Sequence, residues 1–231
     1  MQPTHEAYSE LETAYDHFNE ALFDGQLPKC LLTFQRDKRS YGYFACERFV
    51  NSSGEKTDEI AMNPAMFAVI PVSEIMQTLV HEMAHQWQFH FGKPGRRSYH
   101  NKEWGAKMEA IGLMPSNTGE PGGKKVGEQM MDYIIEGGQF EAACNELLSR
   151  LAITWRDRLP VQKLVDQVMA GAVEGVEAAD LIAMGVELEA PTSKSNRRKY
   201  SCSKCGVNAW GKPNLNLICG DCQERLEDVG T

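Results

Sequence analysis

The chain has 231 residues, 42% of them hydrophobic, which is enough for one medium-sized domain and a smaller module. No uninterrupted apolar stretch approaches the roughly 20 residues that a membrane-spanning helix needs, so we expect no association with a membrane. The formal net charge is −8, and the N-terminus lacks the basic start and apolar stretch of a signal peptide, so we expect a cytoplasmic protein.

The first predicted helix has apolar residues at steps of three and four, which are Tyr8, Leu11, Tyr15, Phe18 and Leu22. Gly25 follows as a stop signal. Residues 30–64 contain β-rich or alternating segments with turn-like breaks at 37–40 and 51–56. We expect these residues to form a small antiparallel meander.

The strongest helical pattern spans residues 73–91. Apolar residues recur there at every fourth position, namely Ile75, Leu79, Met83 and Trp87, and predict a packing stripe. Ser73 is the expected N-cap, and Gly92 and Pro94 end the helix.

Within this helix, residues 81–85 read His-Glu-Met-Ala-His. Residues four apart lie on one helix face, so His81 and His85 can bind one zinc ion at about 2.0–2.1 Å each. Glu82 is rotated away from this pair and can take a proton from a zinc-bound water, whose pKa the metal lowers. Both histidines avoid the packing stripe, so the pattern predicts a catalytic zinc site rather than two ordinary surface histidines.

A catalytic zinc site needs a third protein ligand and an open position. His90 follows His81 by nine residues, which places it on the opposite face of a continuous helix. The chain breaks at Gly92, however, and can return with His100 beside the metal. We therefore expect His100 as the third ligand, with Glu103 as the alternative.

The remaining chain is less regular. We expect a short helix over residues 101–111, a long Gly-rich loop over 115–138, and helices over 139–151 and 161–184. The expected domains are a core at 1–114, a loop and helical insert at 115–189, a basic linker at 190–199, and a terminal module with an acidic tail at 200–231.

The terminal module contains two Cys-x-x-Cys pairs, Cys202 with Cys205 and Cys219 with Cys222, separated by thirteen residues. Two such pairs place four thiolates on one tetrahedral zinc, which fills its coordination sphere. We therefore predict a second zinc ion with a structural role. Metal supplies the stability that so small a module cannot obtain from a core.

Charge is distributed unevenly, with a net of +3 over residues 194–231 and −11 over 1–193. Basic side chains can contact phosphates, and aromatic rings can stack on unpaired bases. The candidate nucleic-acid contacts are Arg96 and Arg97 beside the zinc site, and Arg197, Arg198, Lys199, Lys204, Lys212 and Trp210 in the tail. The alternative is a solvated tether with Trp210 packed into the module.

The His-Glu-Met-Ala-His motif, the basic loop after it and the segment His100-Asn101-Lys102-Glu103-Trp104 together resemble the SprT-like/Spartan metalloprotease family. The fifteen-residue step from His85 to His100 fits that family, and the resemblance covers roughly residues 5–114 and the terminal zinc ribbon. It implies an α+β, zincin-like (minigluzincin-type) domain in which the three histidines bind zinc and Glu82 is the catalytic base. It also implies proteolysis near DNA, notably of proteins crosslinked to DNA. Residues 115–190 depart from the shortest members of the family.

The expected function is therefore a zinc-dependent endopeptidase with a protein substrate and DNA as partner, containing one catalytic and one structural zinc ion. Two alternatives stay open from the sequence. One is a non-enzymatic zinc-binding adaptor for nucleic acid or protein, and the other is a general peptidase without DNA dependence.

Overall fold

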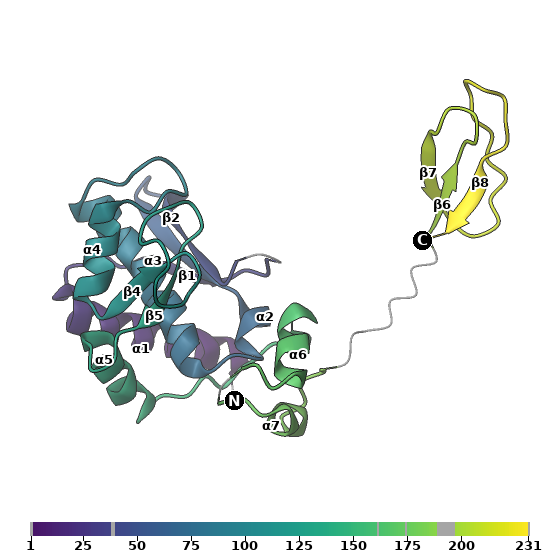
Figure 1. Ribbon diagram of the computed structural model, residues 1–231. Coiled ribbons are helices and arrows are strands. Elements are labelled where there is room, and N and C mark those ends of the chain that lie inside the picture. Colours follow the sequence, from purple (N-terminus) through teal and green to yellow (C-terminus); the bar gives the residue numbers. More distant parts are fainter. Residues whose placement is uncertain (1, 38–39, 161, 174, 189–196, 231) are drawn as a thin grey trace. The chain divides into compact units, whose positions relative to one another are not determined.

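The computed structural model describes residues 2–37, 40–160, 162–173, 175–188 and 197–230. The chain divides into two compact units, Met1–Glu189 and Ala190–Thr231 (Figure 1). The first unit spans both the predicted core and the predicted insert. Nowhere in the described ranges is a helix both long and apolar enough to cross a membrane.

In its described part, the first unit is built from helices, one three-stranded sheet and one two-stranded sheet. In chain order, its elements are α1 (Pro3–Phe23), β1 (Leu31–Phe34), β2 (Gly42–Val50), β3 (Lys56–Met62), α2 (Pro64–Phe67), α3 (Val72–Phe91), α4 (Lys102–Ala110), β4 (Leu113–Ser116), β5 (Met131–Ile134), α5 (Gln139–Leu148), α6 (Gln162–Met169) and α7 (Ala178–Ala183). This mixture of helices and small sheets confirms the predicted α+β class.

The first sheet has the order β1-β3-β2, with β3 in the centre. β2 is antiparallel to β3 as expected, but β1 is parallel to β3, so the predicted antiparallel meander is wrong for this pair. The chain between β1 and β2 crosses to the far edge of β3 instead of turning back as a hairpin. β3 takes the centre because its residues 58–62 are all buried.

A hairpin replaces most of the long loop predicted for residues 115–138. β4 pairs with β5 in antiparallel register, from Leu113 opposite Ile134 to Ser116 opposite Met131. The Gly-rich stretch is the connection of this hairpin. Its turn-forming composition obscures the two short strands that flank it.

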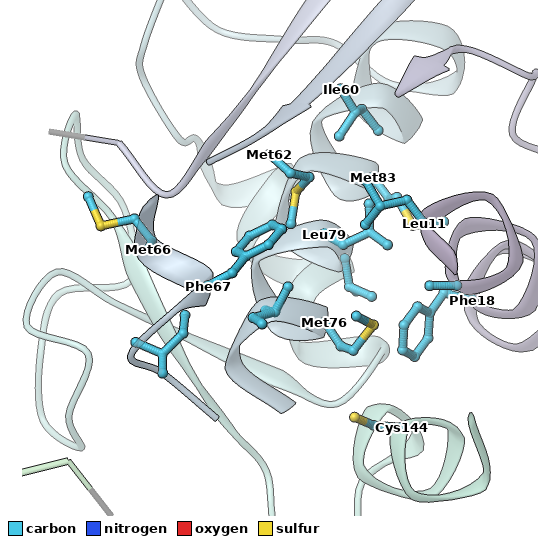
Figure 2. Packing of buried hydrophobic residues seen from close by; sticks show 14 of the residues in the cluster. Leu11, Phe18, Ile60, Met62, Met66, Phe67, Met76, Leu79, Met83 and Cys144 are labelled. Atoms are coloured by element: carbon cyan, nitrogen blue, oxygen red, sulfur yellow. The ribbon is translucent and has the colours of Figure 1, made fainter. Parts of the chain in front are cut away.

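The hydrophobic core surrounds α3. Ile75, Leu79 and Met83 are fully buried, which confirms the predicted packing stripe for these residues. Figure 2 shows Leu79 and Met83 between Met62 of the sheet and Leu11 of α1. Burying one such side chain contributes about 1.5–3 kcal/mol, so this layer holds the motif helix in place.

The start of α3 differs from the prediction. Pro71, not Ser73, is the N-cap residue, and the backbone N–H groups of Glu74 and Ile75 donate to its carbonyl oxygen at 3.1 and 3.3 Å. The proline ring fixes φ at a value suited to entry into a helix, so the N-cap lies two residues earlier than predicted.

The predicted helix over 161–184 is two helices, α6 and α7. Gly171 and Gly175 lie between them with φ of +68° and +71°, in the left-handed region that ends a right-handed helix. α5 likewise ends at Leu148, earlier than predicted.

The second unit contains β6 (Arg198–Ser201), β7 (Asn208–Gly211) and β8 (Glu227–Gly230), arranged in the antiparallel order β7-β6-β8. β6 begins inside the predicted linker 190–199, because Arg198 and Lys199 pair with β7. Residues 190–196 of that linker lie outside the described residues. The core of this unit is small and consists of Tyr200, Cys202, Cys219 and Leu226.

Candidate active site

Three histidines meet where α3 approaches the start of α4. His81 and His85 lie one turn apart on α3, and His100 lies two residues before α4 begins. The Nε2 atoms of His85 and His100 are 3.0 Å apart. One nitrogen from each of the three rings lies within 4.8 Å of the others. The structure thus places together the three residues that the sequence selected; their role as zinc ligands stays a prediction.

The turn between α3 and α4 brings His100 back to α3. Asn101 caps α4 by accepting a hydrogen bond from the Trp104 backbone N–H at 3.1 Å. Gln88 of α3 donates to the side chains of Asn101 and Glu103, both at 2.8 Å. Glu103 also accepts from the Lys93 backbone N–H at 2.6 Å. Glu103, the alternative third ligand, therefore fastens the turn and is not part of the three-histidine group.

His90 lies apart from this group, as the helical geometry indicated. Its Nε2 atom is 2.7 Å from Asp58 Oδ2. Asp58 also accepts a hydrogen bond from the buried Gln86, which in turn accepts one from the Tyr15 hydroxyl at 2.7 Å. This polar cluster, in which Tyr15, Asp58 and Gln86 are buried, ties α1, β3 and α3 together on another face of the motif helix.

Hydrogen bonds that Nδ1 donates determine which nitrogens of the site histidines are available. His81 Nδ1 is 2.7 Å from Asp132 Oδ2, and His100 Nδ1 is 3.2 Å from the Gly127 carbonyl oxygen. Because a carbonyl and a carboxylate both accept hydrogen bonds, Nδ1 is the protonated nitrogen in each ring. Nε2 is then unprotonated in both rings.

The electrostatics of the site favour neutral imidazoles at two positions. Burial, followed by the neighbouring His81, lowers the pKa of His100 to about 4 and that of His85 well below its ordinary value. Burial also lowers the pKa of His81, but the hydrogen bond to Asp132 and the nearby Glu82 outweigh burial and raise that pKa overall. Three converging imidazoles, each able to offer a ring nitrogen, form a donor set that suits zinc.

Glu82 is buried beside strand β2 and lies outside the three-histidine group. Burial raises the pKa of its carboxyl, whereas the charge of His81 and a hydrogen bond from the Phe44 backbone N–H lower it. Gly42 permits this close approach of strand and helix, since a Cβ there would lie 2.9 Å from the Ala61 carbonyl oxygen and 3.5 Å from Glu82 Cγ. The geometry thus places a carboxylate next to the histidines without using it as a ligand.

Trp104 lies against all three histidines. Its ring stacks on that of His85, with the ring centroids 5.1 Å apart. It meets the rings of His100 and His81 edge-on, at centroid distances of 4.5 and 4.9 Å. The side chain is fully buried, and its indole nitrogen has no hydrogen-bond partner within the described part of the chain. Trp104 therefore acts as an apolar wall that fixes the ring positions and excludes water.

Replacing Trp104 by alanine is expected to lower the free energy of unfolding by about 3–5 kcal/mol, because it leaves a large cavity under the three rings. The half-exposed Trp155 is a matched control, since it is 42% exposed and makes one hydrogen bond, to Glu6. Its replacement by alanine is expected to cost about 1 kcal/mol or less. Denaturant unfolding of the two variants measures the difference; equal losses would contradict the supporting role of Trp104.

Sequence reasoning did not identify Asp132, Gly127 or Trp104 as residues of the site. Trp104 belongs to the segment that resembles the family, but the sequence gives it no role of its own. Asp132 offered one weak signal, because aspartate is depleted in strands yet occurs here within the run Met-Asp-Tyr-Ile. Gly127 participates through its backbone, which a sequence pattern cannot show.

The second metal group is the four-cysteine cluster of the C-terminal unit. The sulfur atoms of Cys202, Cys205, Cys219 and Cys222 all lie within 4.8 Å of one another, with Cys205 and Cys219 3.6 Å apart. Hydrogen bonds from the backbone N–H groups of Cys205 and Lys204 lower the pKa of the Cys202 thiol to about 7. Four converging thiols fit the tetrahedral coordination of a structural zinc.

The candidate nucleic-acid contacts are distributed differently. Arg96 forms an ion pair with Glu128 at 2.5 Å, and Arg198 forms one with Asp228 at 3.0 Å. Arg97, Arg197, Lys204 and Lys212 are exposed, and Lys199 is half-buried. Trp210 is 56% exposed and lies directly opposite Lys199 in the β6–β7 pair, so it is not packed into the module.

Residues 11–121 match the model of the SprT-like family. The chain belongs to the SprT-like family. A protein from Salmonella typhimurium, described as "Uncharacterized protein in mucB 3'region", is 58% identical over 59 residues, which cover 25% of this chain and 80% of that protein. No solved structure matches the chain. Membership of the SprT-like family confirms the predicted zincin-like fold class. A four-cysteine module follows the matched domain along the chain.

The SprT-like match contains the whole three-histidine group and Glu82, and it ends inside the connection of the β4–β5 hairpin. Gly127 and Asp132 therefore lie beyond the matched segment. Membership also indicates a metallopeptidase-like domain, and both metal groups are compatible with zinc.

Proposed function

We propose that the protein is a zinc-dependent endopeptidase that acts on DNA-associated proteins, including proteins crosslinked to DNA. The observation that supports the hydrolytic part is the convergence of His81, His85 and His100 beside the buried, uncoordinated carboxyl of Glu82. Three protein ligands leave a coordination position open for substrate or water, as catalytic zinc sites require.

Each residue of the site has a distinct task in this mechanism. Zinc held by the three imidazoles would supply a Lewis acid and lower the pKa of water. Glu82 accepts a proton from the attacking water and delivers it to the leaving amine. Trp104 shields the inner side of the three rings from solvent.

The pairing of strand β2 favours a peptide as the substrate. In the described chain β2 pairs only with β3, and the Phe44 N–H next to Glu82 is turned toward the site rather than toward β3. An extended peptide can add to such a strand edge through main-chain hydrogen bonds. Because these bonds do not involve side chains, the edge can bind peptides of many different sequences. An endopeptidase that removes diverse proteins from DNA needs this tolerance.

The DNA part of the proposal rests on the family resemblance and on the cationic and aromatic side chains of the C-terminal unit. Trp210, Lys199, Lys204 and Lys212 combine a stacking ring with cations, which suits single-stranded nucleic acid. The ion pairs of Arg96 and Arg198 make these two arginines weaker candidates than the exposed Lys204 and Lys212.

The test compares cleavage of one model protein in two forms, free and covalently attached to a single-stranded oligonucleotide. We expect cleavage of the attached form, with the advantage over the free form declining as salt rises. The Trp210→Ala variant should lose this advantage while cutting the free form as the wild type does. Equal cleavage of both forms would indicate a general peptidase, and no cleavage with both zinc sites filled would indicate a binding adaptor.

A further inference from the structure

The β4–β5 hairpin contacts two of the three site histidines through their Nδ1 atoms. Asp132 Oδ2 on β5 lies 2.7 Å from His81 Nδ1. The Gly127 carbonyl oxygen in the hairpin connection lies 3.2 Å from His100 Nδ1. The backbone of His100 also pairs with Gly127, donating at 2.8 Å and accepting at 3.1 Å. Both contacts come from residues beyond 121, outside the segment that matches the family.

We propose that Asp132 is a positioning residue of the zinc site: its carboxylate fixes the tautomer and ring orientation of His81 and thereby tightens metal binding. This inference rests on the proposed function, because it assumes that His81 is a metal ligand. The fold alone does not require an acid here, since the other three residues of β5 are hydrophobic or aromatic.

Asp132 is itself held in place from α3. Its side chain is 5% exposed. Gln77, one turn before His81 on α3, donates from Nε2 to Asp132 Oδ1 at 2.8 Å and to the Asp132 backbone oxygen at 2.7 Å. The other carboxylate oxygen, Oδ2, is therefore left to accept the His81 proton. This arrangement is rigid, because both of its ends are attached to the motif helix.

A carboxylate in this position has two effects on a ligand histidine. In the neutral ring it holds the proton on Nδ1, so that Nε2 is free to bind the metal, and it makes the imidazole a stronger donor. Removing such a partner typically weakens metal binding about 10- to 100-fold. Without Asp132, His81 would lose its tautomer preference and part of its alignment with His85 and His100.

The same helix offers a matched control. His90 and Asp58 form a second carboxylate–histidine pair, also at 2.7 Å, in which the carboxylate is buried and the His90 side chain is 30% exposed, but His90 is not in the three-histidine group. Replacing Asp58 by asparagine removes a comparable charge from the same unit. It should lower stability without changing zinc affinity at the site.

The experiment measures zinc transfer from the full-length protein to a chromogenic chelator, for the wild type, Asp132→Asn and Asp58→Asn. The four-cysteine site serves as an internal reference in each chain. We expect Asp132→Asn to release the zinc of the three-histidine site at about 10- to 100-fold lower chelator concentration than the wild type does. The release of cysteine-bound zinc should be unchanged in this variant, and the release of both ions should be unchanged in Asp58→Asn. Cobalt substitution provides a second readout, because a misaligned His81 should change the visible absorption of the bound ion.

The outcomes separate this inference from the proposed function. If Asp132→Asn binds zinc and cobalt as the wild type does, Asp132 is not a positioning residue, although the peptidase proposal survives. If Asp132→Asn weakens zinc binding while the wild type cleaves nothing, the positioning role stands and the peptidase proposal fails. A wild-type protein that binds zinc only at its cysteines would overturn both.

Discussion

Replacing Glu82 by glutamine is expected to reduce cleavage by about 10²- to 10⁴-fold, the usual contribution of a general base, while the zinc content stays unchanged. Glutamine has nearly the same shape and can still accept the hydrogen bond from the Phe44 N–H. It cannot take up the proton of the attacking water. Because Glu82 is not in the three-histidine group, its loss removes no metal ligand.

The measurement pairs initial cleavage rates with zinc content per chain. Glu74→Gln is a suitable control, since Glu74 lies on the same helix but is exposed and two turns away from Glu82. It should cleave as the wild type does. Cleavage by Glu82→Gln within a factor of two or so of the wild-type rate would end the assignment of Glu82 as the base.

Removing zinc from the four-cysteine cluster is expected to unfold the C-terminal unit and leave the N-terminal unit folded. Among its described residues, the C-terminal unit has a core of four buried residues, two of which are the cysteines Cys202 and Cys219. Apparent zinc-binding free energies of small modules are about 10–16 kcal/mol at neutral pH, and this binding energy is also folding energy. The N-terminal unit has a far larger core that needs no metal.

Amide NMR spectra recorded before and after chelation measure this effect by residue. Signals from residues 197–230 should collapse to random-coil positions, whereas those of the α3 stripe should stay dispersed. Cys219→Ser should reproduce the collapse, while serine in place of the exposed Cys46, which lies outside the cluster, should not. Dispersed signals from the C-terminal unit after complete chelation would show that its strands fold without metal.

Local patterns were sufficient to predict the central part of this molecule. The packing stripe of α3, the placement of His81 and His85 on one face, and the return of the chain at His100 all depend on helical periodicity and a short turn. Such features arise within about twenty residues of sequence, where the geometry of a helix is nearly fixed. The four-cysteine cluster is equally local, because metal ligation imposes its spacing.

Apart from shifted helix ends and one helix that is divided in two, the errors concern contacts between distant segments. The parallel pairing of β1 with β3 depends on which edge of β3 is free, and no local pattern encodes that choice. The β4–β5 hairpin was hidden by glycine and proline between two four-residue strands. Because that hairpin was predicted as a loop, Asp132 had no defined place, and its contact with His81 across 51 residues could not be anticipated.

The thiols of the C-terminal unit have a consequence for the response of the protein to oxidants. Cys205 is exposed, and its sulfur is 3.6 Å from that of Cys219, so oxidation can join neighbouring sulfurs as a disulfide and expel the ion. The three-histidine group contains no sulfur, and burial raises the pKa of the Cys30 and Cys144 thiols in the same unit to about 12 and 11. We therefore expect oxidants to react at the four-cysteine cluster first and to leave the three-histidine group intact.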